Sequence, residues 1–353
     1  MTLRYGVIGT GSMGQEHIRN LTYLDGVEVV AIADPDAGMR QKAEAATGLT
    51  AYSDYRDLIG SVDIDALVIA TPNHTHRSVL KDVLATDLPV LVEKPLCSTV
   101  EDCQAVITIA KGRRAPVWVA MEYRFMPPVA RMLEELDKGA AGRLRMLAIR
   151  EHRFPFLDKV GAWNRFGALS GGTMVEKCCH FFDLMRLITK SEPIRLWGSG
   201  AQDVNHLDEA VDGNIPDVID NAFVTVDFAN GTRALLDLCM FAEASRDQEE
   251  IVATGDEGKV ECGIPSSRLS IGKRGTVKRM GITLPMTTET VPVDPHLLEI
   301  GDHHGATYFE HMAFRDMVRS KGEPAVTLED GLAAVAMGQA AEKSIKDGIP
   351  ITF

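Results

Sequence analysis

The chain has 353 residues, enough for two domains of ordinary size, and a formal net charge of −13. An acidic balance of this size argues against nucleic acid or an anionic membrane as the main partner, because both repel negative charge. Hydrophobic residues make up 45% of the chain and charged residues 25%, which excludes intrinsic disorder over most of its length. No apolar run reaches the roughly 20 residues of a membrane-spanning helix. The first residues carry no signal-peptide pattern, so we expect a cytoplasmic protein.

Short apolar runs alternate with helical patterns as far as residue 121. We expect strands at 3–8, 27–33, 66–70, 89–93 and 116–121, with helices near 13–23, 36–46, 76–86 and 99–112. Continuous apolar strands separated by helices are typical of a parallel sheet with helices on both faces. The sequence therefore predicts a doubly wound α/β domain of the Rossmann type over residues 1–122.

After residue 122 strands follow one another with few helices between them. We expect strands at 146–154, 194–201, 222–228, 233–241, 249–254 and 259–262, with long helices near 173–189 and 329–346. Asn230-Gly231 between two of these runs predicts a hairpin with a type I′ turn. Ala234, Leu236, Leu238 and Met240 share one face of a strand, which predicts an antiparallel sheet with one buried face. This second domain, α+β in class, would span residues 123–353.

A glycine-rich motif follows the first strand and opens the first helix. It consists of Gly9, Thr10, Gly11, Ser12, Met13 and Gly14. Such a motif places helix N–H groups against a pyrophosphate, and Asp34 at the end of the second strand is positioned to bind the adenosine ribose. An acid there repels a 2′-phosphate, so we expect NAD rather than NADP, although Arg40 leaves some NADP use open. The alternative is a simple glycine turn, with Asp34 capping the next helix.

Two further polar segments follow strands of the predicted parallel sheet. The first contains Thr71, Pro72, Asn73 and His76, and the second contains Glu93 and Lys94. Ligands of open α/β sheets bind at the carboxyl ends of strands, so we expect these residues to contact the cofactor and Lys94 to reach the substrate.

The cysteines of the chain form no CxxC pair, so we expect them to be reduced and mostly buried. Cys178 and Cys179 precede His180, but on a helix their side chains point about 100° apart. A zinc site needs four convergent ligands, and we therefore expect no metal.

The motifs together resemble the glucose–fructose oxidoreductase, inositol dehydrogenase and MocA family (Gfo/Idh/MocA). The resemblance rests on GTGSMG with Asp34, on TPNHTH and EKP, on residues 171–183, and on the C-terminal TLEDG. It implies a Rossmann domain, a C-terminal domain with a large open antiparallel sheet, and NAD(P)-dependent oxidation or reduction of sugars and cyclitols. It also implies a cis Lys94–Pro95 bond and a homodimer or homotetramer formed through the sheet, with Leu235, Cys239 and Phe241 on the exposed face.

The resemblance assigns a catalytic triad to Lys94, Glu176 and His180. The family most often has Asp where this chain has Glu176, which changes the reach of the carboxylate. On an unbroken helix Glu176 and His180 would share one face, although such a pair is often only a surface feature. Oxidation of a secondary alcohol needs a base for the hydroxyl proton and a cation for the developing alkoxide. We assign the base to His180, the cation to Lys94, and substrate binding or orientation of His180 to Glu176.

Substrate contacts are expected from Tyr123 and Arg124 after the last Rossmann strand, from His152 on a strand, and from Trp163 and Arg165 in a loop. The favoured function is an NAD-dependent dehydrogenase of a sugar, cyclitol or sugar-derived polyol. Alternatives are an NAD-dependent glycoside hydrolase that oxidises its substrate transiently, and a non-catalytic sugar or dinucleotide sensor.

Overall fold

The computed structural model describes residues 2–61 and 63–353 and divides them into two compact units. The first unit combines the chain up to residue 122 with segments 158–179 and 295–339, and the remaining residues form the second unit. The sequence placed both of these later segments in the second domain. Among the described residues, no helix is long and apolar enough to cross a membrane.

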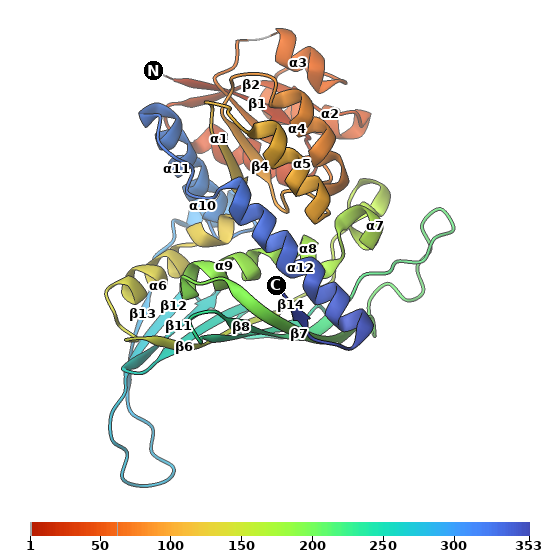
Figure 1. Ribbon diagram of the computed structural model, residues 1–353. Coiled ribbons are helices and arrows are strands. Elements are labelled where there is room, and N and C mark those ends of the chain that lie inside the picture. The colour runs from red at the N-terminus through yellow and green to blue at the C-terminus, as the bar shows by residue number, and fades with distance from the viewer. Residues whose placement is uncertain (1, 62) are drawn as a thin grey trace. The chain divides into compact units, whose positions relative to one another are not determined.

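The first unit contains a five-stranded parallel sheet in the order β2-β1-β3-β4-β5. Its strands are β1 (Leu3–Ile8), β2 (Val27–Ala33), β3 (Ala66–Ile69), β4 (Val90–Glu93) and β5 (Val117–Ala120). The helices of this part of the chain are α1 (Ser12–Tyr23), α2 (Ala37–Thr47), α3 (Tyr55–Ser61), α4 (His76–Val83) and α5 (Val100–Ala110). They lie on both sides of the sheet, as the alternating pattern predicted (Figure 1).

The two later segments, 158–179 and 295–339, pack on the first unit. Local sequence patterns did not predict this long-range packing. They carry α7 (Gly167–Ser170), α8 (Thr173–Glu176), α10 (Pro295–Ile300), α11 (Ala306–Ser320) and the first part of α12 (Leu328–Asp347). On α12, an added Cβ at Gly331 would lie 3.0 Å from Leu96 and 3.1 Å from Val119. The Asn73 side chain donates to the Ser170 carbonyl at 3.0 Å. These contacts place residues distant in sequence around the parallel sheet.

The second unit contains a nine-stranded sheet in the order β13-β12-β11-β10-β6-β9-β8-β7-β14. Its strands are β6 (Leu144–His152), β7 (Pro193–Ala201), β8 (Asn221–Phe228), β9 (Arg233–Cys239), β10 (Glu249–Gly255), β11 (Gly258–Ile264), β12 (Arg268–Lys273), β13 (Met286–Thr290) and β14 (Ile351–Thr352). All neighbours are antiparallel except β6 and β9, which pair in parallel. The predicted large antiparallel sheet is thus confirmed, with one parallel pair at its centre, where β6 and β9 are neighbours in space but are separated in sequence by β7 and β8.

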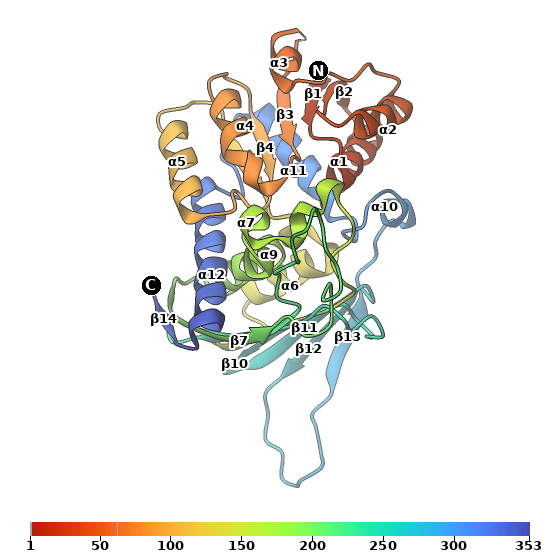
Figure 2. The ribbon, with the colours of Figure 1, turned by 90° about the vertical axis from the view of Figure 1, so that its right-hand side faces the viewer.

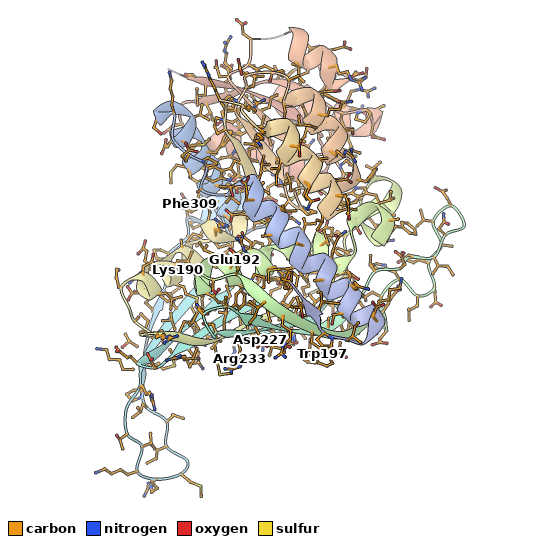
Figure 3. The ribbon with its side chains drawn as sticks, in the orientation of Figure 1. Lys190, Glu192, Trp197, Asp227, Arg233 and Phe309 are labelled. Carbon is orange, nitrogen blue, oxygen red and sulfur yellow. The ribbon has the colours of Figure 1, made fainter. Side chains whose placement is uncertain are left out.

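Helices cover one face of this sheet. Figures 1 and 2 show α6 (Pro127–Asp137) and α9 (Cys179–Thr189) on that side, and none of the helices in the described part of the chain lies on the other side. Ala234, Leu236, Leu238 and Met240 are buried, as predicted. Trp197, Asp227 and Arg233 lie on the open side (Figure 3).

The hairpin between β8 and β9 forms as predicted, but its turn is not type I′. A type I′ turn needs positive φ at both central residues, and here Gly231 has φ of 85° whereas Asn230 is not among the positive-φ residues. The Asn230 side chain instead accepts the Thr232 N–H at 3.0 Å. The Phe228 N–H donates to the Thr232 carbonyl at 2.9 Å, so a longer loop closes the hairpin.

A buried charged network joins α1 to the loop before α11 in the first unit. Glu16 accepts from His303 at 3.0 Å and from the Thr307 hydroxyl at 2.7 Å. Burial alone would raise the pKa of Glu16, but the neighbouring charge of His303 lowers it to about 2. Burial alone would lower the pKa of His303, but Glu16 and then Glu122 raise it to about 9 against the opposing charge of Lys177.

We predict that this network makes folding stability depend on pH above neutrality. Because the folded state raises the pKa of His303 above its usual 6.5, its contribution is complete below pH 6.5 and is lost as the pH rises through 9. The free energy of unfolding of the wild type should therefore exceed that of His303→Gln by at most about 3 kcal/mol at pH 6. Urea unfolding of both proteins from pH 6 to 10 measures this difference, and a gap that does not narrow contradicts the prediction.

Candidate functional site

A cavity of about 920 Å³ lies at the carboxyl ends of the parallel strands in the first unit. Its size suits a dinucleotide or drug-sized ligand. The predicted residues that line it are Gly9, Gly11, Ser12, Met13, Asp34, Thr71, Pro72, Asn73, Glu93, Lys94, Trp163 and Glu176. The fold thus brings most of the predicted cofactor residues together with two members of the predicted triad.

The glycine motif has the shape that a pyrophosphate requires. Gly9 has φ of 88°, and a Cβ on Gly14 would lie 2.0 Å from the Gly9 carbonyl oxygen, so neither position tolerates a side chain. A Cβ on Gly11 would meet nothing within 4 Å, which leaves open space beside the helix. Helix α1 begins at Ser12 without a side-chain cap, so its first N–H groups remain available to a phosphate. The residues present therefore fit a dinucleotide.

Asp34 is held in place at the end of β2 by the glycine motif itself. Its carboxylate accepts from the Thr10 N–H at 2.7 Å and from the Asp36 N–H at 2.8 Å. The helix cap is supplied by Asp36, which accepts the Met39 N–H at 2.9 Å, so Asp34 does not cap α2. Arg40 donates to the backbone carbonyl of Asp34 at 2.9 Å.

His76 has a different position from the one we predicted. Its imidazole is fully buried and lies 2.9 Å from the Thr71 carbonyl and 2.9 Å from the Pro95 carbonyl. It is not among the residues that line the cavity. His76 therefore joins the loops that follow β3 and β4 rather than facing the cofactor space, whereas Thr71, Pro72 and Asn73 do face it.

Lys94 forms the centre of a buried ion cluster. The Lys94–Pro95 bond is cis, as the resemblance implied. Lys94 Nζ donates to the Glu176 carboxylate at 3.2 Å and to the Glu176 carbonyl at 3.1 Å, and Lys159 Nζ donates to the other carboxylate oxygen at 3.2 Å. Burial alone would raise the pKa of Glu176, but Lys94 and Lys159 lower it. Burial alone would lower the pKa of Lys94, but Glu176 above all raises it, so both groups are charged at neutral pH.

The helix that we predicted over 173–189 is interrupted just after Glu176. Helix α8 ends at Glu176 and α9 starts at Cys179. The Cys178 N–H donates to the Thr173 carbonyl at 3.2 Å, an i to i−5 bond that widens the turn. Glu176 and His180 are therefore not neighbours on one regular helix. At this interruption the Glu176 carbonyl accepts from Lys94 Nζ at 3.1 Å and from the Cys179 thiol at 3.7 Å.

His180 belongs to the second unit, which also contains the predicted substrate residues Tyr123 and Arg124. Its ring is buried and stacks on Tyr123, with centroids 4.2 Å apart and planes 8° apart. The Tyr123 hydroxyl donates to Glu249 at 3.2 Å. The next residue, Arg124, donates to Asp183 at 2.6 Å, on the same helix as His180. These contacts fix the plane of the His180 ring.

The remaining predicted substrate residues separate into two groups. Trp163 lines the cavity of the first unit and carries Lys159 over its ring, 4.6 Å from the centroid, while Arg165 pairs with Asp158. His152 instead pairs with Asp237 at 3.0 Å. It is the last residue of β6 and lies on the face opposite to the buried residues of that strand, so we leave it out of the site.

Sequence reasoning missed several members of the site. Lys159 lies in a loop and only its contact with Glu176 reveals it. His17 gave no signal beyond its place three residues after Gly14, yet its Nε2 lies 2.8 Å from the Glu93 carboxylate. Within residues 2–61 and 63–353, no group of three or more His, Cys, Asp or Glu side chains could hold a metal ion.

Two family models match the chain. Residues 3–121 match the NAD-binding Rossmann fold of an oxidoreductase family (GFO_IDH_MocA), and residues 134–353 match the C-terminal alpha/beta domain of that family. Over 190 residues the chain is 32% identical to rhizopine catabolism protein MocA of Rhizobium meliloti, a match that covers 54% of this chain and 58% of that protein.

Other relatives match over nearly their full length. The chain is 29% identical to inositol 2-dehydrogenase 1 of Saccharopolyspora erythraea, covering 99% of this chain and 96% of that protein. It is 27% identical to myo-inositol 2-dehydrogenase of Thermotoga maritima, a match that covers 98% of this chain and 97% of that protein. A structure of levoglucosan dehydrogenase with NADH and levoglucosan superposes on this chain with a TM-score of 0.84 at 20% identity. The match covers 100% of this chain and 99% of that chain, which shows a shared fold. The chain therefore belongs to the Gfo/Idh/MocA family of NAD-binding oxidoreductases.

Proposed function

We propose that this protein is an NAD-dependent dehydrogenase that oxidises a secondary hydroxyl of a cyclitol, a sugar or a related polyol. The observation that carries the proposal is the ion cluster of Lys94, Glu176 and Lys159, which lies in the same cavity as the glycine motif. When bound, NAD supplies the hydride acceptor. The chain must then supply a base for the hydroxyl proton and a positive charge for the developing alkoxide.

The charge state of Lys94 decides its role. A general base must be neutral at the working pH, and the buried carboxylate of Glu176 raises the pKa of Lys94 and keeps it an ammonium. Lys94 therefore serves as the donor that holds the substrate oxygen. His180, only four residues after Glu176 in the chain, is the proposed base, because stacking on Tyr123 holds its ring in one orientation.

A polyol substrate fits the charged groups of the cavity. A carboxylate held between two ammonium groups accepts hydrogen bonds from hydroxyls, and the ammonium groups donate to hydroxyl oxygens. Glu176, Lys94 and Lys159 together offer this alternation in one cavity. Several relatives are named inositol dehydrogenases, which supports a cyclitol. A glycoside hydrolase that regenerates its NAD would show no net NADH, so a screen of cyclitols and sugars by NADH absorbance separates the two functions.

The proposed roles predict three different kinetic outcomes. Lys94→Ala should lower kcat at least about a hundredfold, the scale for losing one transition-state charge contact. His180→Ala should lower kcat by a similar factor, and kcat of this variant should no longer depend on pH between pH 6 and 8. Glu176→Gln should mainly raise KM if Glu176 binds substrate. Steady-state kinetics with the best polyol of the screen measures all three.

The matched control is Lys111→Ala, which removes an exposed lysine of the first unit. Calorimetric titration of NAD should give similar affinities for all four variants, because the glycine motif and Asp34 are unchanged. Near-normal kcat for Lys94→Ala and His180→Ala would show that neither side chain takes part in the reaction.

The contacts of Asp34 predict the cofactor preference. Its carboxylate is fixed at the mouth of the glycine motif, where it bonds to ribose hydroxyls and repels a 2′-phosphate. We expect kcat/KM to be at least about tenfold higher with NAD than with NADP, about 1.4 kcal/mol. Asp34→Ala should reduce this ratio, and Arg40→Ala should leave it high. Equal efficiency with both cofactors in the wild type would contradict the prediction.

We also propose that copies of the chain associate through the open face of the nine-stranded sheet. Exposed apolar side chains gather there, with Met146 61% exposed, Phe223 56% and Trp197 44%. Leu235 lines a shallow cavity of about 780 Å³ on the same face. Apolar patches of this kind mark association surfaces.

We predict a homodimer or a homotetramer that buries more than about 1,000 Å² at this face. Light scattering coupled to gel filtration measures the mass. Trp197→Glu should raise the dissociation constant at least about tenfold, because it places a charge in an apolar contact. A wild-type mass of 38.5 kDa at micromolar concentration would contradict the prediction.

A further inference from the structure

An extended hairpin projects from the second unit between β12 and β13. We call residues 273–285 the basic arm. Every residue in it is exposed, and Figures 1 and 2 both show it leaving the sheet on the side away from α6 and α9. Each leg of about six extended residues spans about 20 Å.

The side chains of the basic arm are unlike those of an ordinary solvated loop. Met280 is 96% exposed, and the other exposed apolar side chains are those of Val277, Ile282 and Leu284. The arm also carries Lys273, Arg274, Lys278 and Arg279 and has no acidic residue, in a chain whose formal net charge is −13. Apolar side chains held in water by an extended loop mark a contact with another molecule. The cations specify that the contacted surface is acidic.

The second unit carries one segment of matching chemistry, residues 202–219 between β7 and β8, which we call the acidic loop. It contains Asp203, Asp208, Glu209, Asp212 and Asp217 and neither Lys nor Arg. It also exposes apolar side chains, namely Ile215 at 68%, Val204 at 53% and Leu207 at 49%. Hydrogen bonds hold the first part of this loop, because the Asp220 carboxylate accepts the N–H groups of residues 203, 204 and 205.

The basic arm of one chain cannot meet the acidic loop of the same chain. β12 and β8 are five strand spacings apart in the sheet order, about 24 Å. The strand pairings also make β12 and β7 end at opposite ends of the sheet. Figure 1 shows the two segments leaving the sheet at opposite ends.

We propose that the basic arm of one copy docks on the acidic loop of a second copy of this chain. The inference rests on the proposed association through the open sheet face and specifies its geometry. Packed sheets are about 10 Å apart, so an arm of about 20 Å that leaves the sheet on its open side reaches beyond the partner's sheet.

The positions of the two segments also determine how the copies are related. Arm and loop lie at diagonal corners of the sheet, so a two-fold axis in the plane of the interface brings arm and loop together only when the axis is perpendicular to the diagonal that joins them. The strands of the two sheets then cross at close to 90°, one of the two usual sheet-packing arrangements. The symmetry forms the arm-to-loop contact twice in each pair.

Charge exchange between the two segments tests the proposal. Sedimentation velocity at 50 mM and 500 mM salt gives the dissociation constant of the wild type, of Lys278→Glu with Arg279→Glu, of Asp208→Lys with Asp212→Lys, and of all four changes combined. Each pair of reversals should raise the dissociation constant at least about tenfold at low salt, because like charges then oppose each other. The combined variant should return to within about threefold of the wild type, and high salt should shrink all differences.

The outcomes separate this inference from the proposals on which it rests. Charge reversals without effect, in a protein that Trp197→Glu still dissociates, overturn the arm-to-loop contact alone. A monomeric wild type overturns the association as well, whereas dehydrogenase activity is assayed independently of both. Failure of the combined variant to recover also overturns the contact. Co-sedimentation of the wild type with phosphatidylserine vesicles, lost on arm reversal, would assign the arm to a membrane instead.

Discussion

The interaction on which the first unit depends is the burial of Glu93 beside Lys94. A buried charge costs several kcal/mol unless an opposite charge accompanies it. Burial alone would raise the pKa of Glu93, but His17 and Lys94 lower it, and its carboxylate also accepts the Lys94 N–H at 3.0 Å. Lys94 in turn needs Glu176, and Glu176 is held by Lys159. A single chain of counterions thus joins α1, β4, α8 and the loop that contains Lys159.

This requirement explains why later parts of the sequence belong to the Rossmann unit. Segment 158–179 contributes Lys159 and Glu176, and segment 295–339 contributes His303, which balances Glu16 and lies 3.7 Å from Glu122. The first segment supplies Glu176 as the counterion of Lys94, and the second supplies His303 as the counterion of Glu16. Burial raises the pKa of Glu122 to about 7, although the charge of His303 opposes this shift. The ion pairs proposed for catalysis therefore also stabilise the fold.

The sequence predicted features whose cause is local and missed those whose cause is distant. Gly9, Gly14 and Asp34 follow from the strict geometry of one turn, and the apolar alternation of β9 follows from one buried face. The parallel pairing of β6 with β9 and the partnership of Lys159 with Glu176 depend on residues that only the folded chain brings together. The helix break after Glu176 has a local cause, the hydrogen bond from the Cys178 N–H to the Thr173 carbonyl. The sequence did not predict it, because the apolar periodicity of a helix continues through the break.

The same cluster explains how Glu can replace the usual Asp in this chain. The longer side chain reaches Lys159 as well as Lys94, so Glu176 is shared by two ammonium groups at 3.2 Å each. Lys94 also lies beside the buried carboxylate of Glu93, which is a second counterion for this ammonium group. The ammonium group of Lys94 is a fixed positive charge, which stabilises an oxygen that becomes negative more than it stabilises the neutral hydroxyl. In the proposed mechanism Glu176 therefore keeps Lys94 charged, as the developing alkoxide requires, and also accepts a hydrogen bond from Lys159.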